Sequence, residues 1–249
     1  MLKIRAEQME ALRQGVREEY ERRVLDHIAR YFPQQMRLFG RERLHPLAAR
    51  SIDQASSYQM ISEESTYVYA DAMILLGVDF DVDPQLPFAG TILREPGVSE
   101  RERAANLYDA GKDYWLQVAG SDGGGWKEAF RNFRKFPVGW NRQLSDGEFL
   151  EIVGGLLARL YPSKHTFLGG GGVKKFLQFS ADKGAEMGIE TRPGIAVLAA
   201  LMFLGGSGFL NDPRFDWIEA FLGEPARQQD NWLVRLHEQA SQHFEEWVR

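Results

Sequence analysis

The chain has 249 residues, of which 44% are hydrophobic and 26% charged, and its formal net charge at pH 7 is −5. Its 16 Phe, 8 Tyr and 6 Trp side chains supply far more buriable surface than a disordered segment carries, so the composition excludes a disordered chain. The absence of cysteine excludes a disulfide scaffold, a thiolate zinc site and a cysteine nucleophile, and fits a reducing compartment. The isoelectric point near 5.6 argues against a general nucleic-acid binder.

Two segments bear on the location of the protein. The start of the chain is charged and follows a helical pattern, without the apolar core and small-residue cleavage site of an export signal. The longest apolar run, Ile195–Leu204, has ten residues, about half of what a membrane-spanning helix requires. We therefore expect a cytoplasmic protein in which the run at 195–204 forms a buried helix.

Helical periodicity runs through residues 1–94. A first helix is predicted from about residue 5 to 32, because apolar residues recur three and four apart along it. They are Met9, Leu12, Val16, Tyr20, Val24 and Ile28. Further helices are predicted near 42–58 and 63–76, and a fourth from Asp83-Pro84, where Asp caps free amides and Pro suits the first helical position.

A connector at 95–144 has helices of its own. Ser99 and Glu102 form a capping box that opens a helix to about Val118, and a glycine-rich break follows. The next predicted helix, Trp126 to Phe136, is basic and aromatic, with charged and apolar side chains on different faces. Its residues and those just after it are the candidate partner-binding site: Trp126, Lys127, Phe130, Arg131, Arg134, Lys135, Trp140 and Arg142.

The third part of the chain, 145–249, again follows a helical pattern. A capping box of Ser145 and Glu148 opens its first helix, which ends at Pro162. Helices are expected at about 172–186 and 192–204, and from Asp212-Pro213. An amphipathic helix near 230–247 closes the chain.

The chain resembles itself at a spacing of 129 residues. The stretch 29–33 (ARYFP) recurs as 158–162 (ARLYP), and the apolar, aspartate and proline positions at 80–93 recur at 209–222. Between them we infer a slip of one residue, which matches Ile61 with Ile189 and Gly77 with Gly205. The recurring positions are helix-face apolar residues, helix stops and caps, which indicates a duplicated structural unit rather than a duplicated active site. We predict an all-α protein with two tandem four-helix units, 1–94 and 145–249, joined by the helical connector 95–144, plus a C-terminal helix within the second unit.

Three motifs have a chemical alternative. Asp79-Phe80-Asp81-Val82-Asp83 resembles the opening of a calcium loop, but the loop's glycine and bidentate glutamate positions hold Pro84 and Gly90. The four glycines at 169–172 lack a phosphate-loop signature and are predicted to link two helices. The five histidines are scattered, without helical metal-ligand spacing. We therefore expect no metal, no cofactor and no enzymatic activity, and a metal-dependent hydrolase at Asp79–Asp83 is the opposing hypothesis.

The basic helix leaves two interpretations open. Its cations suit nucleic acid, an anionic membrane surface or an acidic partner. Packing of its aromatic face into the core, with the cations in water, explains the same pattern.

The first unit resembles a small helical family of uncharacterised bacterial proteins. The resemblance covers about residues 1–95 and is carried by Ile4-x-x-Glu-Gln8, Ala29-Arg30-x-Phe32-Pro33, Ile61 and the stretch 75–84 (LLGVDFDVDP). Members look like neighbours of type VI secretion spike, tip and effector genes. The resemblance implies a cytoplasmic accessory that binds a secreted effector, a spike component or a toxin, as adaptor and chaperone or as immunity protein.

Overall fold

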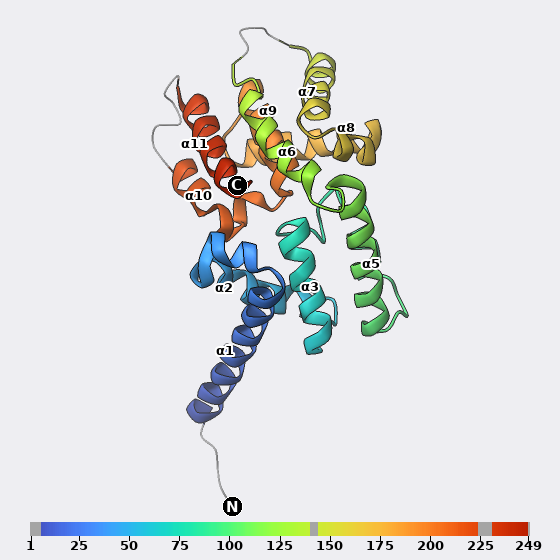
Figure 1. The fold of residues 1–249 in the computed structure, drawn as a ribbon, viewed down its shortest axis with the longest axis vertical. Coiled ribbons are helices and arrows are strands. Elements are labelled where there is room, and N and C mark those ends of the chain that lie inside the picture. Colours follow the sequence, from blue (N-terminus) through green and yellow to red (C-terminus); the bar gives the residue numbers. More distant parts are fainter. Residues whose placement is uncertain (1–5, 140–143, 224–230, 249) are drawn as a thin grey trace, which may run out of the picture.

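The computed structural model describes residues 6–139, 144–223 and 231–248, and every regular element in these ranges is helical (Figure 1). The all-α prediction is confirmed. The first five helices are α1 (Ala6–Tyr31), α2 (Pro33–Ser57), α3 (Glu63–Leu76), α4 (Pro87–Leu93) and α5 (Glu100–Val118). The connector continues with α6 (Gly124–Asn132) and the 3-10 turn η1 (Phe133–Lys135). The remaining elements are α7 (Asp146–Leu160), α8 (Pro162–Glu186), α9 (Arg192–Gly205), η2 (Phe209–Asn211), η3 (Pro213–Phe215), α10 (Asp216–Gly223) and α11 (Trp232–Trp247).

Both predicted capping boxes begin their helices, α5 and α7. Ser99 and Ser145 each accept the backbone N–H of a glutamate three residues on, and that glutamate bonds back to the serine N–H. Ser62 and Thr191 cap α3 and α9 through their hydroxyl groups.

Two predicted helices begin earlier than expected. Both α2 and α8 start at a proline and kink after about two turns, at Gly40 (φ 72°) and Gly169 (φ 63°). A proline in the first helical position lets the chain restart a helix at once, and only glycine adopts the left-handed kink without strain. The predicted glycine link is therefore a single kink at Gly169, and Gly170–Gly172 are helical.

The fourth helix of each unit begins later than predicted. It starts at Pro87 in α4 and at Asp216 in α10, while Pro213 opens only the short turn η3. Asp83 opens only a turn, in which its carboxylate accepts the N–H groups of Gln85 and Ser207, both at 2.8 Å. The predicted helix 126–136 likewise ends at Asn132 and continues as η1.

Helix bounds recur at a constant spacing. Helices α2 and α8 begin and end 129 residues apart, as do α3 and α9, and the last residues of α1 and α7 and of α5 and α11 have the same separation. Positions 129 residues apart are called paired positions below. The inferred one-residue slip is absent from these bounds, since Gly77 pairs with Gly206 and both cap a helix with positive φ. The common origin of the two units stays a prediction.

The two predicted units, 1–94 and 145–249, meet at these paired glycines. A Cβ on Gly77 would lie 2.6 Å from the carbonyl oxygen of Gly205, and a Cβ on Gly206 would lie 3.1 Å from that of Leu76. The contact therefore has the same form from either side, as in a two-fold interface. Around it a single apolar core runs through both units.

Helix α1 projects from the body of the molecule towards its N-terminal end (Figure 1). The predicted apolar stripe is buried only in the second half of the helix, at Val24 and Ile28. Met9, Leu12 and Val16 remain exposed, because no described segment packs beside them. In the described ranges no helix is long and apolar enough to cross a membrane.

Candidate functional site

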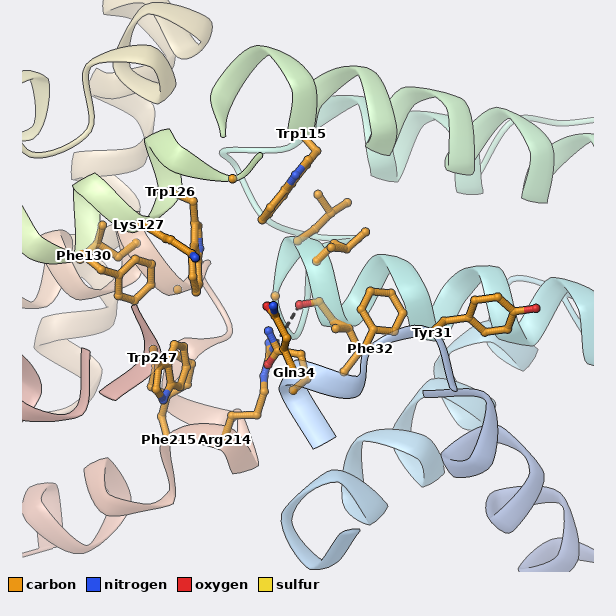
Figure 2. Close-up of a pocket in the computed structure, with 18 of the residues that line it drawn as sticks. Tyr31, Phe32, Gln34, Trp115, Trp126, Lys127, Phe130, Arg214, Phe215 and Trp247 are labelled. Atoms are coloured by element: carbon orange, nitrogen blue, oxygen red, sulfur yellow. Dashed lines mark hydrogen bonds between the residues drawn. The ribbon is translucent and has the colours of Figure 1, made fainter. Parts of the chain in front are cut away.

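A pocket of about 380 Å³ lies at the junction of the two units and the connector. The corner between α1 and α2 and the C-terminal end of α3 form one side, and α6 forms the opposite side. The ends of α5, α9 and α11 complete it. Figure 2 shows that residues far apart in the sequence converge there from both units. We call it the aromatic pocket.

Three tryptophans from three helices make the walls of the pocket aromatic. The Trp126 ring lies 6.4 Å from both the Trp115 and Trp247 rings and stacks on the latter at 17°. It also contacts the buried Phe130 ring at 4.5 Å, and Phe215 contacts Trp247 at the same distance. Side chains that contact one another in this way hold their orientation, so the aromatic walls are preorganised.

The polar groups of the pocket are few. Arg214 is nearly buried, pairs with Asp212 at 2.6 Å and donates from Nη1 to the Ile74 carbonyl at 2.8 Å. Asp122 accepts the N–H of Gly124 at 2.9 Å, which shapes the turn before α6. Lys127 lines the pocket next to Trp126 and has no ion-pair partner within the described residues. The side-chain oxygen of Gln35 is buried without a hydrogen-bond donor.

The structure divides the predicted partner-binding residues into two groups. Trp126, Lys127 and Phe130 line the aromatic pocket. Arg131, Arg134 and Lys135 lie on the outer side, exposed to solvent. There Arg131 donates to the Val248 carbonyl at 3.2 Å and Arg134 pairs with Glu245, while Phe130 and Phe133 are buried against α11. Trp140 and Arg142 lie outside the described residues.

Several pocket residues were missed by sequence reasoning. Gln34 and Gln35 follow directly on the repeated ARYFP stretch, and Arg214 follows the second Asp-Pro step. Trp115 and Trp247 lie in two of the predicted helices, the one that ends near Val118 and the one near 230–247. Nothing in local spacing distinguishes a half-buried tryptophan at a junction from one inside the core, so only the packing of distant helices identifies them.

The acidic string at 79–83 is bound by the protein's own donors. Asp79 accepts from Arg50 at 2.5 Å and Gln54 at 3.1 Å, and Asp81 accepts the Tyr58 hydroxyl at 2.7 Å. Asp83, already engaged by two backbone N–H groups, is fully buried. These contacts hold the loop between α3 and α4 in place.

A buried lysine lies at the position paired with Gln35. The Lys164 ammonium donates to the Phe203 carbonyl at 2.7 Å, and it also lies over the Phe203 ring in a cation–π contact. Burial lowers the pKa of Lys164 to about 8, although the nearby Asp83 carboxylate opposes the shift. Burial likewise raises the pKa of Asp83, against the attraction of Lys164.

Among the residues that the structure describes, no cluster of three or more His, Cys, Asp or Glu side chains could hold a metal ion. Comparisons with family models, curated proteins and solved structures found no match for this chain. The chemistry of the site is therefore inferred from its geometry.

Proposed function

We propose that this protein is a non-enzymatic protein-binding adaptor and that its partner docks at the aromatic pocket. The observation that carries the proposal is the convergence of Trp115, Trp126 and Trp247, each on a different helix, at one pocket between the two units. Energetically dominant residues of protein interfaces are enriched in Trp, Tyr and Arg and lie in preformed pockets. A partner side chain inserted there would be desolvated by rigid aromatic walls.

The charges of the pocket support binding rather than chemistry. Arg214 is already neutralised by Asp212, so among the described residues that line the pocket Lys127 is the cation available to a ligand. One carboxylate oxygen of Asp122 accepts a backbone N–H. We therefore expect the partner to present an apolar or aromatic side chain accompanied by a carboxylate that reaches Lys127.

The biological setting rests on the resemblance of residues 1–95 to the type VI secretion-associated family. Within that setting we propose a cytoplasmic adaptor and chaperone that loads an effector. An immunity protein is the alternative, and deletion of the gene separates the two. Loss of effector export indicates the adaptor, whereas self-intoxication indicates the immunity protein.

Binding of nucleic acid or membrane through 126–142 is a weaker proposal. Phe130 and Phe133, the aromatic residues that would enter a lipid surface, are packed against α11. The exposed cations Arg131, Arg134 and Lys135 remain for nucleic acid. A salt-sensitive gel shift that is lost on charge reversal at Arg131 and Arg134 would favour this function over docking at the pocket.

The test of docking uses two matched surface substitutions. Leu75 lines the pocket and Ile152 on α7 does not, and both are 39% exposed. Leu75→Glu should abolish co-purification of the partner from the native host and its rebinding as a purified protein. Ile152→Glu should leave both unchanged. Equal retention by the two variants would reject the pocket as the docking site.

A further inference from the structure

One face of the second unit is covered by the connector. The segment α6–η1 packs against α11, where the Phe133 ring lies 5.2 Å from Phe244 and 4.8 Å from His237. Phe130 meets Phe244 edge to face at 4.6 Å. On the other side Asn132 reaches the Leu160 carbonyl of α7 at 3.5 Å. Two aromatic side chains three residues apart thus seal the space between α7 and α11.

The paired face of the first unit has no such cover among the described residues. Trp115, Tyr108 and Tyr31 are the positions paired with Phe244, His237 and Leu160. Tyr31 is 59% exposed and Tyr108 55%, whereas Leu160 and Phe244 are 2% and 1% exposed. In Figure 1, α6 lies between α7 and α11, and it is in contact with both helices. We call the exposed side of α5 that carries Tyr108 and Trp115 the α5 face.

The charges beside the α5 face differ from those beside α11. On the second unit, Arg134 of η1 lines a surface hollow with Glu238 and Gln242 and pairs with Glu245. The positions paired with Glu238, Ser241 and Gln242 are Asp109, Lys112 and Asp113, which are all exposed, and the position paired with Glu245 is the apolar Leu116. Within the described ranges neither aspartate has an ion pair. Two carboxylates and one ammonium therefore border the place that a covering helix would take, and their net negative charge favours a basic occupant.

We infer that the α5 face binds a basic amphipathic helix of a partner protein, which presents two aromatic side chains three residues apart and a following arginine or lysine. The inference rests on the proposed function and specifies the partner's binding element. Trp115 belongs to both the α5 face and the aromatic pocket, so one helix can lie along α5 and place its end at the pocket. A second copy of this chain does not supply the helix, because its α6–η1 segment is already packed on its own second unit.

A labelled peptide tests the inference directly. The probe is a synthetic peptide with this chain's own residues 124–136 (GGWKEAFRNFRKF), which carries the required spacing of aromatic and basic side chains. Its binding to the full-length protein is measured by fluorescence anisotropy at low ionic strength. A second peptide with Phe130→Ser and Phe133→Ser is the control for the aromatic anchors.

Matched protein variants locate the bound peptide. Asp109→Lys with Asp113→Lys, and separately Tyr108→Ala, should weaken binding at least tenfold, and the control peptide should bind at least tenfold more weakly than the probe. Glu238→Lys with Gln242→Lys, at the paired positions, should leave binding unchanged. Saturable binding with this pattern supports the inference.

Two results would overturn the inference. They are an absence of binding by the peptide, and binding that is weakened only by the second-unit substitutions, which would mean exchange with α6–η1. If either result accompanied loss of the natural partner on Leu75→Glu, the proposed adaptor function would stand and only the helix class would be wrong. If binding of the natural partner were also unchanged by Leu75→Glu, both proposals would fail.

Discussion

The corner between α1 and α2 and the paired corner between α7 and α8 have the same backbone path but different contents. At the second corner, Lys164 bonds to the Phe203 carbonyl and Ser163 donates to the Val118 carbonyl at 2.6 Å, so the space is filled. At the first corner, the paired residue is Gln35, and the Ile74 carbonyl instead accepts a hydrogen bond from Arg214 of the other unit. The same carbonyl position thus receives a cation from its own unit in one case and from the opposite unit in the other. The difference shows that side chains at the junction, rather than the helical frame, determine where a pocket remains.

The largest expected effect is a difference in stability between the face of α11 that α6–η1 covers and the exposed α5 face. Phe244→Ala should lower the free energy of unfolding by about 4 kcal/mol, because it leaves a cavity beneath α6–η1. Trp115→Ala, at the paired position, should cost only about 1–2 kcal/mol, because the ring is partly exposed to water. Urea denaturation of the two variants measures the difference. Equal losses would mean that the α5 face is as tightly packed as its counterpart.

The junction itself is tested by a smaller change. Gly77→Ala should cost about 3 kcal/mol, because the new methyl group would overlap the Gly205 carbonyl at a positive φ. Gly97 also has a positive φ, of 77°, but nothing lies within 4 Å of its Cβ position. Gly97→Ala should therefore cost only about 1 kcal/mol. Thermal denaturation of both proteins isolates the contact between units, and similar costs would show that the close approach contributes little.

A third prediction concerns the pH dependence of stability at Lys164, in the corner between α7 and α8. The folded-state pKa of Lys164 is lowered to about 8, so between pH 8 and 10 the folded protein binds fewer protons than the unfolded chain. Stability contributed at this position therefore rises with pH in that window, by about 2 kcal/mol in total. The difference in unfolding free energy between the wild type and Lys164→Met should increase accordingly. Lys175→Met, on the exposed side of α8, controls for the loss of one positive charge, and a flat difference for Lys164→Met would refute the prediction.

The sequence was sufficient to predict elements that depend on neighbouring residues. Capping boxes at Ser99 and Ser145, the helical period of apolar residues and the stop at Pro162 are local, and each lies where expected. The start of the fourth helix was predicted incorrectly: Asp83 accepts the Gln85 N–H as a cap does, but only a turn follows, and its other oxygen bonds to Ser207, a residue more than a hundred positions away. Local rules treat such an aspartate as a cap, although its carboxylate is used in a tertiary contact.

The candidate site was predictable only in part, for a related reason. The clustering of aromatic and basic residues led to Trp126, Lys127 and Phe130, which do line the pocket. The same pattern grouped them with Arg131 and Arg134, although a helix that packs on one side separates these residues into the pocket and the outer surface. The side of α6 that faces the junction depends on where α11 lies, and no spacing within 126–142 encodes the position of α11.

The smallest expected effect concerns those outer charges. Arg134 and Glu245 form an ion pair whose side chains are 64% and 39% exposed. Water and salt screen such a pair, so Arg134→Ala should change the unfolding free energy by less than about 1 kcal/mol, with a smaller change at high salt. Phe133→Ala, one residue away and fully buried, should cost several times more. Urea denaturation at low and high salt compares them. If the two costs were similar, aromatic packing would contribute no more than the ion pair to holding η1 on α11, and the binding element inferred for the α5 face would not depend on aromatic anchors.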